Sequence, residues 1–478
     1  MLQTLILLVY FVFLIAVASL SYKKQRSDTD FIIGNRSLNF WLTALSAHAS
    51  DMSSWLFLGY PAMIYTQGLF GGWAAIGLTI GMFLSWQFIA PKLRITTEQS
   101  NSLTINSYFE TRFGDTSGAI RIVSAVMSVL FYTFYITSGL VGMGVLVETL
   151  LHLSYTTGIS IGLLIVVLYV FAGGYRTIAY IDLFQGFFLL AVILFIPLLL
   201  LFRIGGFDPV METLHMKNLS TSLFPDWRPT TLVEIILLAA GWGLGYFGQP
   251  HILTKFMGIR RVNDMAKAKW LGISWQIIAL TCATVVGLLG IYTFPNGIDD
   301  TQKVILQIVQ TTLPLFFAGL VLCAILAATT NVMAAQILVV ASNLAEDFYK
   351  RLYHRNAQSR ELLWVSRASV VFISLVAYLI AYFKISTIYQ LVLYSWSGLG
   401  AAFGPLVLLS LYRKTINRYG AFMGILIGGM TAAVWPYIEK HLPWKIPELV
   451  AGFIFGLIAI ELFSWITRSK KEVQNIFE

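Results

Sequence analysis

Polar residues that could handle a cation lie in the middle of an apolar run. The run spans residues 40–65 and contains His48, Ser50, Asp51, Ser53 and Ser54. A lone carboxylate at the centre of a bilayer costs about 2.5–3.5 kcal/mol on insertion scales, so Asp51 needs a partner, a proton or a water-lined cavity. Ionisable side chains at this depth mark ion or proton pathways. Asp51 is therefore a candidate coupling residue.

The same run carries small residues at Ala47, Ala49, Ser50 and Ser53, which make local unwinding of a helix easier. Unwound turns are tolerated at membrane depth where they line a cavity or are buried in protein, and their carbonyl oxygens can hold a cation. We expect a broken helix here. The alternative is a continuous helix whose serines bond to its own carbonyls and whose Asp51 pairs with a neighbouring helix.

A second interrupted run lies at residues 231–257 and contains GWGLGYFGQPH. Pro250 has no N–H to donate, which leaves the carbonyl of Tyr246 without its helical partner, and four glycines permit unwinding. Trp242, Tyr246 and Pro250 are spaced by four and are expected to share one helix face. The alternative is an aromatic stripe packed on a neighbouring helix with a tolerated proline kink.

Membrane-spanning helices must position these residues, because 57% of the chain is hydrophobic and 12% is charged. A span needs about 20 apolar residues to cross the bilayer core. The chain is predicted to be an all-α polytopic membrane protein with about 13 transmembrane helices. The spans are predicted near 2–21, 40–65, 71–91, 120–151, 156–173, 178–203, 231–257, 270–293, 314–346, 363–383, 385–411, 417–437 and 447–467, with a short outer helix at 304–313.

Composition excludes several other classes of protein. The net charge of +9 arises from lysines and arginines in short loops between spans, so it does not indicate nucleic-acid binding. Cys282 and Cys323 fall inside spans, which excludes a disulfide framework or a cysteine metal cluster. No HExxH, GxSxG or nucleotide loop is present, so we predict no enzyme. The first 20 residues lack a basic start and are predicted to be a retained span.

The distribution of basic residues predicts the orientation. Of the 32 lysines and arginines, 25 fall in loops on one predicted side and 7 on the other. The inner side includes Lys23, Lys24, Arg26, Lys470 and Lys471 at the two ends. Because cytoplasmic loops are rich in Lys and Arg, we expect an outer N-terminus and an inner C-terminus in the cell inner membrane.

The two interrupted spans lie five spans apart, so each opens a five-helix unit. Interrupted helices at corresponding positions of two halves point to an inverted-repeat transporter with its ligand near the midplane. The chain then divides into a peripheral first helix and loop at 1–36, a first repeat at 37–203, a second repeat at 231–411, and peripheral C-terminal helices at 412–478.

Several separated motifs in the chain agree with one known family. They are GNRSL at 34–38, ALSA at 44–47, ASDMS at 49–53, Gly173-Gly174 with Asp182 and Gln185, GYFGQPH at 245–251, AILAA at 324–328 with Gln336, and Glu346-Asp347 with Tyr349-Lys350. The chain resembles the sodium/solute symporter family, and within it the proline branch. The resemblance covers nearly the whole chain and implies a LeuT-like core of two inverted repeats that couples sodium entry to solute uptake.

The resemblance also implies the site residues. For recognition of L-proline the matching positions are Ser53, Gly59, Tyr135, Trp242, Tyr246 and Pro250. Sodium would take the carbonyl oxygens of Ala49, Met52 and Ala328, and Asp51 and Asp182 are the acidic residues tied to cation handling. Aromatic walls for an apolar ring and unwound backbone for a zwitterion are what such a ligand needs.

The chain departs from the family pattern at two places. Asn331 and Val332 stand where the family places a Ser/Thr pair on the eighth core helix, and valine cannot supply an oxygen. His48 stands where the proline branch has a small residue. Histidine can change charge near neutral pH, although a neutral His48 bonded to a backbone carbonyl is the alternative.

The leading hypothesis is a proline transporter coupled to a cation, with sodium favoured. Proton-coupled or sodium-independent transport through Asp51, Asp182 or His48 is the alternative, and a membrane sensor of the same fold is a further one. We expect the partners to be the solute and the lipid bilayer, with no nucleic acid and no obligate protein partner.

Overall fold

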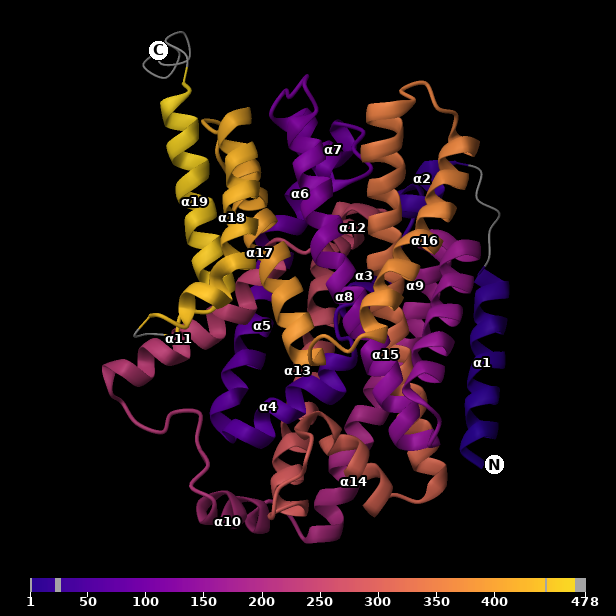
Figure 1. Cartoon of the computed structure of the whole chain (residues 1–478), viewed down its shortest axis with the longest axis vertical. Coiled ribbons are helices and arrows are strands. Elements are labelled where there is room, and N and C mark those ends of the chain that lie inside the picture. Colours follow the sequence, from indigo (N-terminus) through magenta and orange to yellow (C-terminus); the bar gives the residue numbers. More distant parts are fainter. Residues whose placement is uncertain (1, 22–26, 443–444, 469–478) are drawn as a thin grey trace.

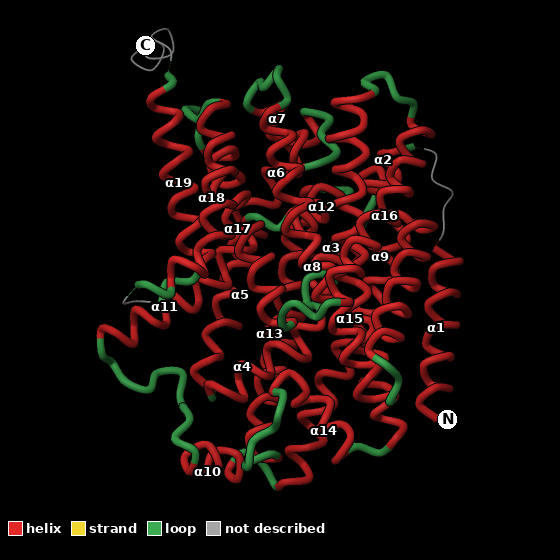
Figure 2. Tube along the Cα trace, viewed as in Figure 1, coloured by secondary structure: helices red, strands yellow, loops and turns green. Residues whose placement is uncertain are grey.

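The computed structural model describes residues 2–21, 27–442 and 445–468, and within them the chain is helical without a strand (Figures 1 and 2). Ten helices of this described part are long and apolar enough to cross a membrane. The predicted all-α polytopic class is therefore confirmed. The terminal basic residues Lys23, Lys24, Arg26, Lys470 and Lys471 lie outside the described residues.

The helices follow the predicted spans closely but with more interruptions. The α-helices are α1 Leu2–Ser21, α2 Asp28–Ile33, α3 Phe40–Ala49, α4 Tyr60–Gln67, α5 Gly72–Leu84, α6 Ala90–Gln99, α7 Ile105–Arg112, α8 Ala119–Leu151, α9 Tyr155–Ile204, α10 Asp208–Met216, α11 Pro229–Gly243, α12 Pro250–Gly258, α13 Met265–Thr293, α14 Val304–Thr312, α15 Leu315–Ser342, α16 Ser359–Tyr382, α17 Ile388–Tyr412, α18 Arg418–Glu439 and α19 Glu448–Ile466. Shorter 3-10 or π segments are η1 Gly34–Arg36, η2 Trp55–Gly59, η3 Leu69–Gly71, η4 Ser85–Ile89, η5 Leu244–Phe247, η6 Val262–Asp264, η7 Thr301–Lys303 and η8 Asn343–Tyr353. The short helix expected at 304–313 is α14.

Helix α9 covers 50 residues and consists of two helices joined at a kink. At 1.5 Å per residue it would be about 75 Å long, more than twice the thickness of a bilayer core. Gly174 lies inside it at φ 59° and ψ −174°, a backbone conformation open to glycine alone. The Gly173-Gly174 motif therefore lies at the kink between the two helical parts of α9.

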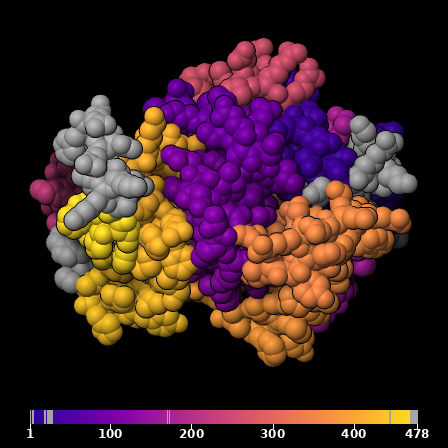
Figure 3. All heavy atoms as spheres, turned by 90° about the horizontal axis from the view of Figure 1, so that it is seen from above, coloured from indigo at the N-terminus to yellow at the C-terminus, as the bar shows by residue number. Residues whose placement is uncertain are grey.

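Helices α3 and α12, which flank the two breaks, lie in the middle of the bundle, whereas α11 runs out toward one edge (Figure 1). Helix α1 packs on α9 and α15 at one edge, and α18 packs on α19 and α17 at the other. At the end that carries the C-terminus, α6 and α7 lie between the α15–α16 side and the α18–α19 side (Figure 3). Helix α10 lies at the opposite end (Figure 1).

The GNRSL motif joins the start of the first interrupted helix to the end of the second. The Arg36 guanidinium donates to the carbonyls of Met257 at 2.8 Å, Thr97 at 3.0 Å and Ser102 at 2.9 Å. Leu38 and residues 258–260 form an isolated parallel bridge. These bonds satisfy carbonyls that helix ends leave without intrahelical partners, and they hold the two segments in register.

Candidate functional site

The first interrupted helix breaks between Ala49 and Trp55, as expected. Helix α3 ends at Ala49, and the chain resumes as a π segment at Trp55. The Ser53 N–H donates to the Asp51 carbonyl at 3.0 Å, so the Ala49 carbonyl loses its helical partner. The continuous-helix alternative is wrong, although the Ser50 hydroxyl does bond back to a carbonyl, that of Ser46.

The second interrupted helix breaks between α11 and α12, also as expected. The segment η5 is followed by Gly248 and Gln249 in non-helical conformations, and α12 restarts at Pro250. The Tyr246 carbonyl that Pro250 leaves without a helical N–H accepts from the Ser85 hydroxyl at 3.3 Å. The glycines serve close packing as well as unwinding, because Gly243 lies against Gly77 and Gly81 of α5.

A buried pocket lies between the two breaks, and we call it the central pocket. Its empty volume is ≈ 260 Å³. Only ≈ 20 Å³ of this is free space, so the pocket is nearly closed by its own side chains in this conformation. Its lining comes from the breaks and from α5, α8 and α17: Asp51, Met52, Trp55, Leu78, Tyr135, Trp242, Tyr246, Val392 and Trp396.

Aromatic rings form most of the wall of the central pocket. Trp55 lies against Trp242 with ring centroids 4.8 Å apart, and Tyr246 meets Trp396 edge-on at 5.0 Å. The Trp396 indole N–H donates to the Trp242 carbonyl at 2.9 Å, which fixes that ring. Sequence reasoning missed Trp55 and Trp396, because an aromatic residue inside an apolar span has the pattern of an ordinary core residue.

Asp51 is the carboxylate of the central pocket. It accepts a hydrogen bond from the Tyr246 hydroxyl, which in turn accepts from the Gln276 amide nitrogen at 3.2 Å. In the described part of the chain no basic side chain pairs with Asp51, which is 6% exposed. Its carboxylate therefore has a hydrogen-bond donor but no counter-ion among the described residues.

Asp182 of α9 is a carboxylate of a different kind. It accepts from the Ser46 hydroxyl of α3 and pairs with the Lys255 ammonium of α12 at 3.1 Å. Asp182 is fully buried and Lys255 is 2% exposed. Lys255 is one of the 25 basic residues that were assigned to loops on the inner side, and that assignment is wrong, since Lys255 lies in α12 under the Tyr175 ring. Asp182 does not line the central pocket.

His48 is fully buried between aromatic rings, where its Nε2 accepts from the Trp86 indole N–H at 3.1 Å. Indole is a donor only, so Nε2 carries a lone pair and the imidazole is neutral in this conformation. The alternative in which a neutral His48 bonds to a backbone carbonyl is wrong about the partner, which is the Trp86 indole. The structure does not bring His48 into the central pocket.

Three of the six residues expected to bind the solute line the central pocket, and three do not. Tyr135, Trp242 and Tyr246 line it. The Ser53 hydroxyl accepts from the backbone N–H of Trp55 at 3.2 Å. A Cβ on Gly59 would meet the Trp55 ring at 2.8 Å, so both residues position Trp55. Pro250 lines a different pocket, because the break at Gly248 ends the shared helix face that its spacing predicted.

The residues expected to hold sodium lie on α3, the first break and α15. The carbonyls of Ala49 and Met52 flank the break, and Ala328 and Asn331 lie in α15, which contacts α3. Asn331 is fully buried, and neither atom of its amide has a hydrogen-bond partner among the described residues. Thr329 and Thr330 are close in sequence, but their hydroxyls donate back to helix carbonyls at 2.7 and 2.8 Å.

Two broken helices around a buried pocket, inside an all-helical bundle, define a membrane transporter. The model of the sodium:solute symporter family matches residues 31–428. The chain is 36% identical to the high-affinity proline transporter PutP of Bacillus subtilis (strain 168), over 96% of this chain and 97% of that protein. It is 36% identical to the sodium/proline symporter of Escherichia coli (strain K12), over 95% and 91%. The chain belongs to the sodium:solute symporter family.

A solved structure of a Na⁺-coupled sialic acid symporter, in a substrate-bound outward-open state, has the same fold. Its TM-score is 0.83 at 18% sequence identity, and the match covers 98% of each chain. The resemblance that the sequence motifs indicated is confirmed. Membership in a family of symporters also agrees with the expectation that the chain is not an enzyme.

Proposed function

We propose that this protein imports L-proline by sodium-coupled symport with alternating access. The observation that carries the proposal is the Asp51 carboxylate, which has no counter-ion in the described part of the chain and lies inside a small aromatic pocket between two broken helices. The full-length similarity to proline transporters supports proline as the solute.

The lining of the central pocket has the chemistry that a zwitterion with a small apolar ring needs. Trp55, Trp242 and Tyr135 provide apolar and aromatic surface for the ring. Unwound backbone at the two breaks supplies polar groups for the charged ends, and Asp51 supplies negative charge for a cation. In this proposal Ser53 and Gly59 act by positioning Trp55, and Pro250 acts by leaving the Tyr246 carbonyl without a helical N–H.

For sodium we propose the carbonyl oxygens of Ala49, Met52 and Ala328 with the Asn331 amide oxygen. Hard cations prefer oxygen ligands, and the unpartnered Asn331 amide offers one where the family has a hydroxyl. Val332 supplies no oxygen. This loss favours a second candidate, in which the same fold carries proline with a proton or without an ion.

We propose that the chain crosses the membrane 13 times, with inverted repeats at 37–203 and 231–411. Ten long helices in the described residues are apolar enough to cross, and one of them is the part of α9 after the kink at Gly174. The part of α9 before the kink, the first broken helix and α1 supply the other three crossings. Positive loops on the side of the C-terminus support an inner C-terminus and an outer N-terminus.

Counterflow of labelled proline in proteoliposomes tests the proposal. Vesicles loaded with unlabelled proline should take up labelled proline transiently, and proline should outcompete sugars, sialic acid and other amino acids. A sugar that competes better would refute the pocket assignment, and absence of counterflow for every amino acid would refute transport.

A further inference from the structure

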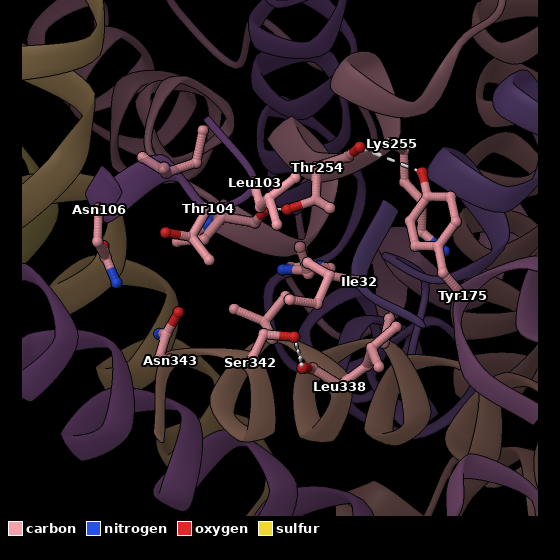
Figure 4. A pocket seen from close by; sticks show the side chains of 15 residues that line it. Ile32, Leu103, Thr104, Asn106, Tyr175, Thr254, Lys255, Leu338, Ser342 and Asn343 are labelled. Atoms are coloured by element: carbon pink, nitrogen blue, oxygen red, sulfur yellow. Dashed lines mark hydrogen bonds between the residues drawn. The ribbon is translucent and has the colours of Figure 1, made fainter. Parts of the chain in front are cut away.

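Two buried histidines of the transport core, His48 and His251, each have one ring nitrogen without a hydrogen-bond partner among the described residues. In His251 this nitrogen is Nε2, since the Tyr132 hydroxyl lies 3.0 Å from Nδ1. His251 lines a pocket beside Lys255 with ≈ 20 Å³ of free space, which is enough for about one water (Figure 4). A water can therefore satisfy His251.

His48 differs because it lines neither that pocket nor the central pocket. Its Nε2 accepts from the Trp86 indole N–H at 3.1 Å, which places the hydrogen of the neutral imidazole on Nδ1. Nδ1 is the nitrogen of His48 that lacks a partner. Because buried donors are normally paired, we expect an acceptor from a neighbouring helix to take this hydrogen.

Helix α13 offers that acceptor. Its Gly272 makes room for the imidazole, because a Cβ on Gly272 would collide with His48 Nε2. Gln276 lies one turn further along the same face of α13, and its side chain interacts with the imidazole. The Gln276 amide oxygen is buried and accepts from no other described group. Pairing the His48 Nδ1–H with Gln276 Oε1 therefore satisfies both atoms.

The other end of the Gln276 amide contacts the residue that bonds to Asp51. Its nitrogen donates to the Tyr246 hydroxyl at 3.2 Å. A tyrosine hydroxyl has a single hydrogen, and Tyr246 donates it to the Asp51 carboxylate. A reversed amide would turn its oxygen toward Tyr246 and compete with Asp51 for that hydrogen. It would also turn an N–H toward the His48 Nδ1–H, so His48 excludes this orientation.

We propose that His48 is a positioning residue for the coupling carboxylate. It orients the Gln276 amide, and the amide keeps the Tyr246 hydroxyl donating to Asp51. His48 stays neutral in this role and carries no proton. It stands where the proline branch has a small residue, so this contact lies outside the family pattern. The inference rests on the proposed sodium-coupled transport and extends the role of Asp51.

The sodium dependence of proline uptake into proteoliposomes that hold the full chain tests the proposal. His48→Phe keeps a ring and removes both nitrogens, and Gln276→Leu removes the amide. Each should raise the sodium concentration for half-maximal uptake by roughly 5-fold, the effect of about one hydrogen bond. The double variant should show no further rise, and neither change should matter in a Tyr246→Phe background.

Gln185→Leu is the matched control. Gln185 is also a buried glutamine that donates to a tyrosine hydroxyl, but its partner at 2.6 Å is Tyr10 of the peripheral helix α1. This variant should leave the sodium concentration for half-maximal uptake unchanged. A rise equal to that of Gln276→Leu would show that loss of any such buried bond has the same effect, and it would overturn the proposal.

His48→Asn separates positioning from packing. Its amide nitrogen can donate from near the place of Nδ1, although the side chain is smaller than a ring. The proposal therefore predicts that His48→Asn is closer to the wild type than His48→Phe. The reverse order overturns it, as do additive effects of His48→Phe and Gln276→Leu, or effects that persist without the Tyr246 hydroxyl.

Thermal melting of each variant checks that it is folded. Should the His48 variants not fold, Gln276→Leu with and without Tyr246→Phe decides the matter by the same criterion. If wild-type uptake of proline needs no sodium, or if no proline is taken up, the proposed function itself fails, which is a separate outcome.

Discussion

The two buried carboxylates of the transport core, Asp51 and Asp182, have opposite surroundings. Asp182 has a lysine at 3.1 Å and a serine hydroxyl, and it lies away from the central pocket. Asp51 lines the central pocket and has a tyrosine hydroxyl but no basic partner in the described residues. One carboxylate is paired with a lysine, and the other has only a hydrogen-bond donor among the described residues.

This difference suggests a division of roles. Asp182 contacts both broken helices, α3 through Ser46 and α12 through Lys255, so it can fix their relative positions. Asp51 is the carboxylate that can respond to a transported ion. Residue type alone could not separate these roles, because both are aspartates in apolar spans. We infer that Asp182 positions the helices and that Asp51 meets the cation.

The largest effect is expected from removing one member of the ion pair. Asp182→Asn leaves the buried Lys255 without a counter-charge, which costs about 3–5 kcal/mol of stability. Thermal melting of the purified protein should show a large loss. Adding Lys255→Met to Asp182→Asn removes the unpaired charge and should restore most of the lost stability. If Asp182→Asn melts like the wild type, the pair does not stabilise the fold.

The next effect concerns transport rather than stability. Asp51→Asn keeps the shape of the side chain and removes its charge, so gradient-driven proline accumulation should fall by about 100-fold, which corresponds to ~2.7 kcal/mol. The variant should melt close to the wild type, because no buried cation loses its partner. Full accumulation by Asp51→Asn protein would leave this carboxylate with a structural role only.

A smaller effect is expected for the hydroxyl that contacts Asp51. Tyr246→Phe removes a hydrogen bond to a charged group, a bond of about 1.5–3 kcal/mol, so the transport efficiency for proline should fall by roughly 10-fold or more. Tyr155→Phe is the matched control, since its hydroxyl donates to the Ala381 carbonyl at 2.8 Å, away from the central pocket. Equal losses of transport in both variants would show that the hydrogen bond to Asp51 makes no specific contribution to transport.

The smallest effect is expected at the altered sodium site. Asn331→Ser with Val332→Thr restores the hydroxyl pair of the family, so half-maximal uptake should need a few-fold less sodium, a change below about 1.4 kcal/mol. Uptake measured over a range of sodium concentrations gives this value. Sodium dependence that is absent in the wild type and present in the double variant would instead favour the ion-independent candidate.

The sequence alone predicted the positions of both helix breaks, because glycines, prolines and buried polar residues act on the local backbone. It could not predict that Lys255 would reach Asp182, or that Ser85 would satisfy the Tyr246 carbonyl, since these partners are far apart along the chain. The spacing of Trp242, Tyr246 and Pro250 wrongly predicted that all three share one helix face. Helical spacing holds only within one helix, and the break at Gly248 lies between Tyr246 and Pro250.

The most direct test sets sodium and proton gradients independently across proteoliposomes. One charge that crosses 100 mV supplies about 2.3 kcal/mol whichever cation carries it, so only the identity of the ion differs between the two arms. We predict that the wild type accumulates proline with a sodium gradient alone, that Asp182→Asn with Lys255→Met still does so, and that Asp51→Asn does not. Accumulation driven by protons without sodium, or sodium-driven accumulation that survives Asp51→Asn and is lost in the neutralised pair, would contradict the account.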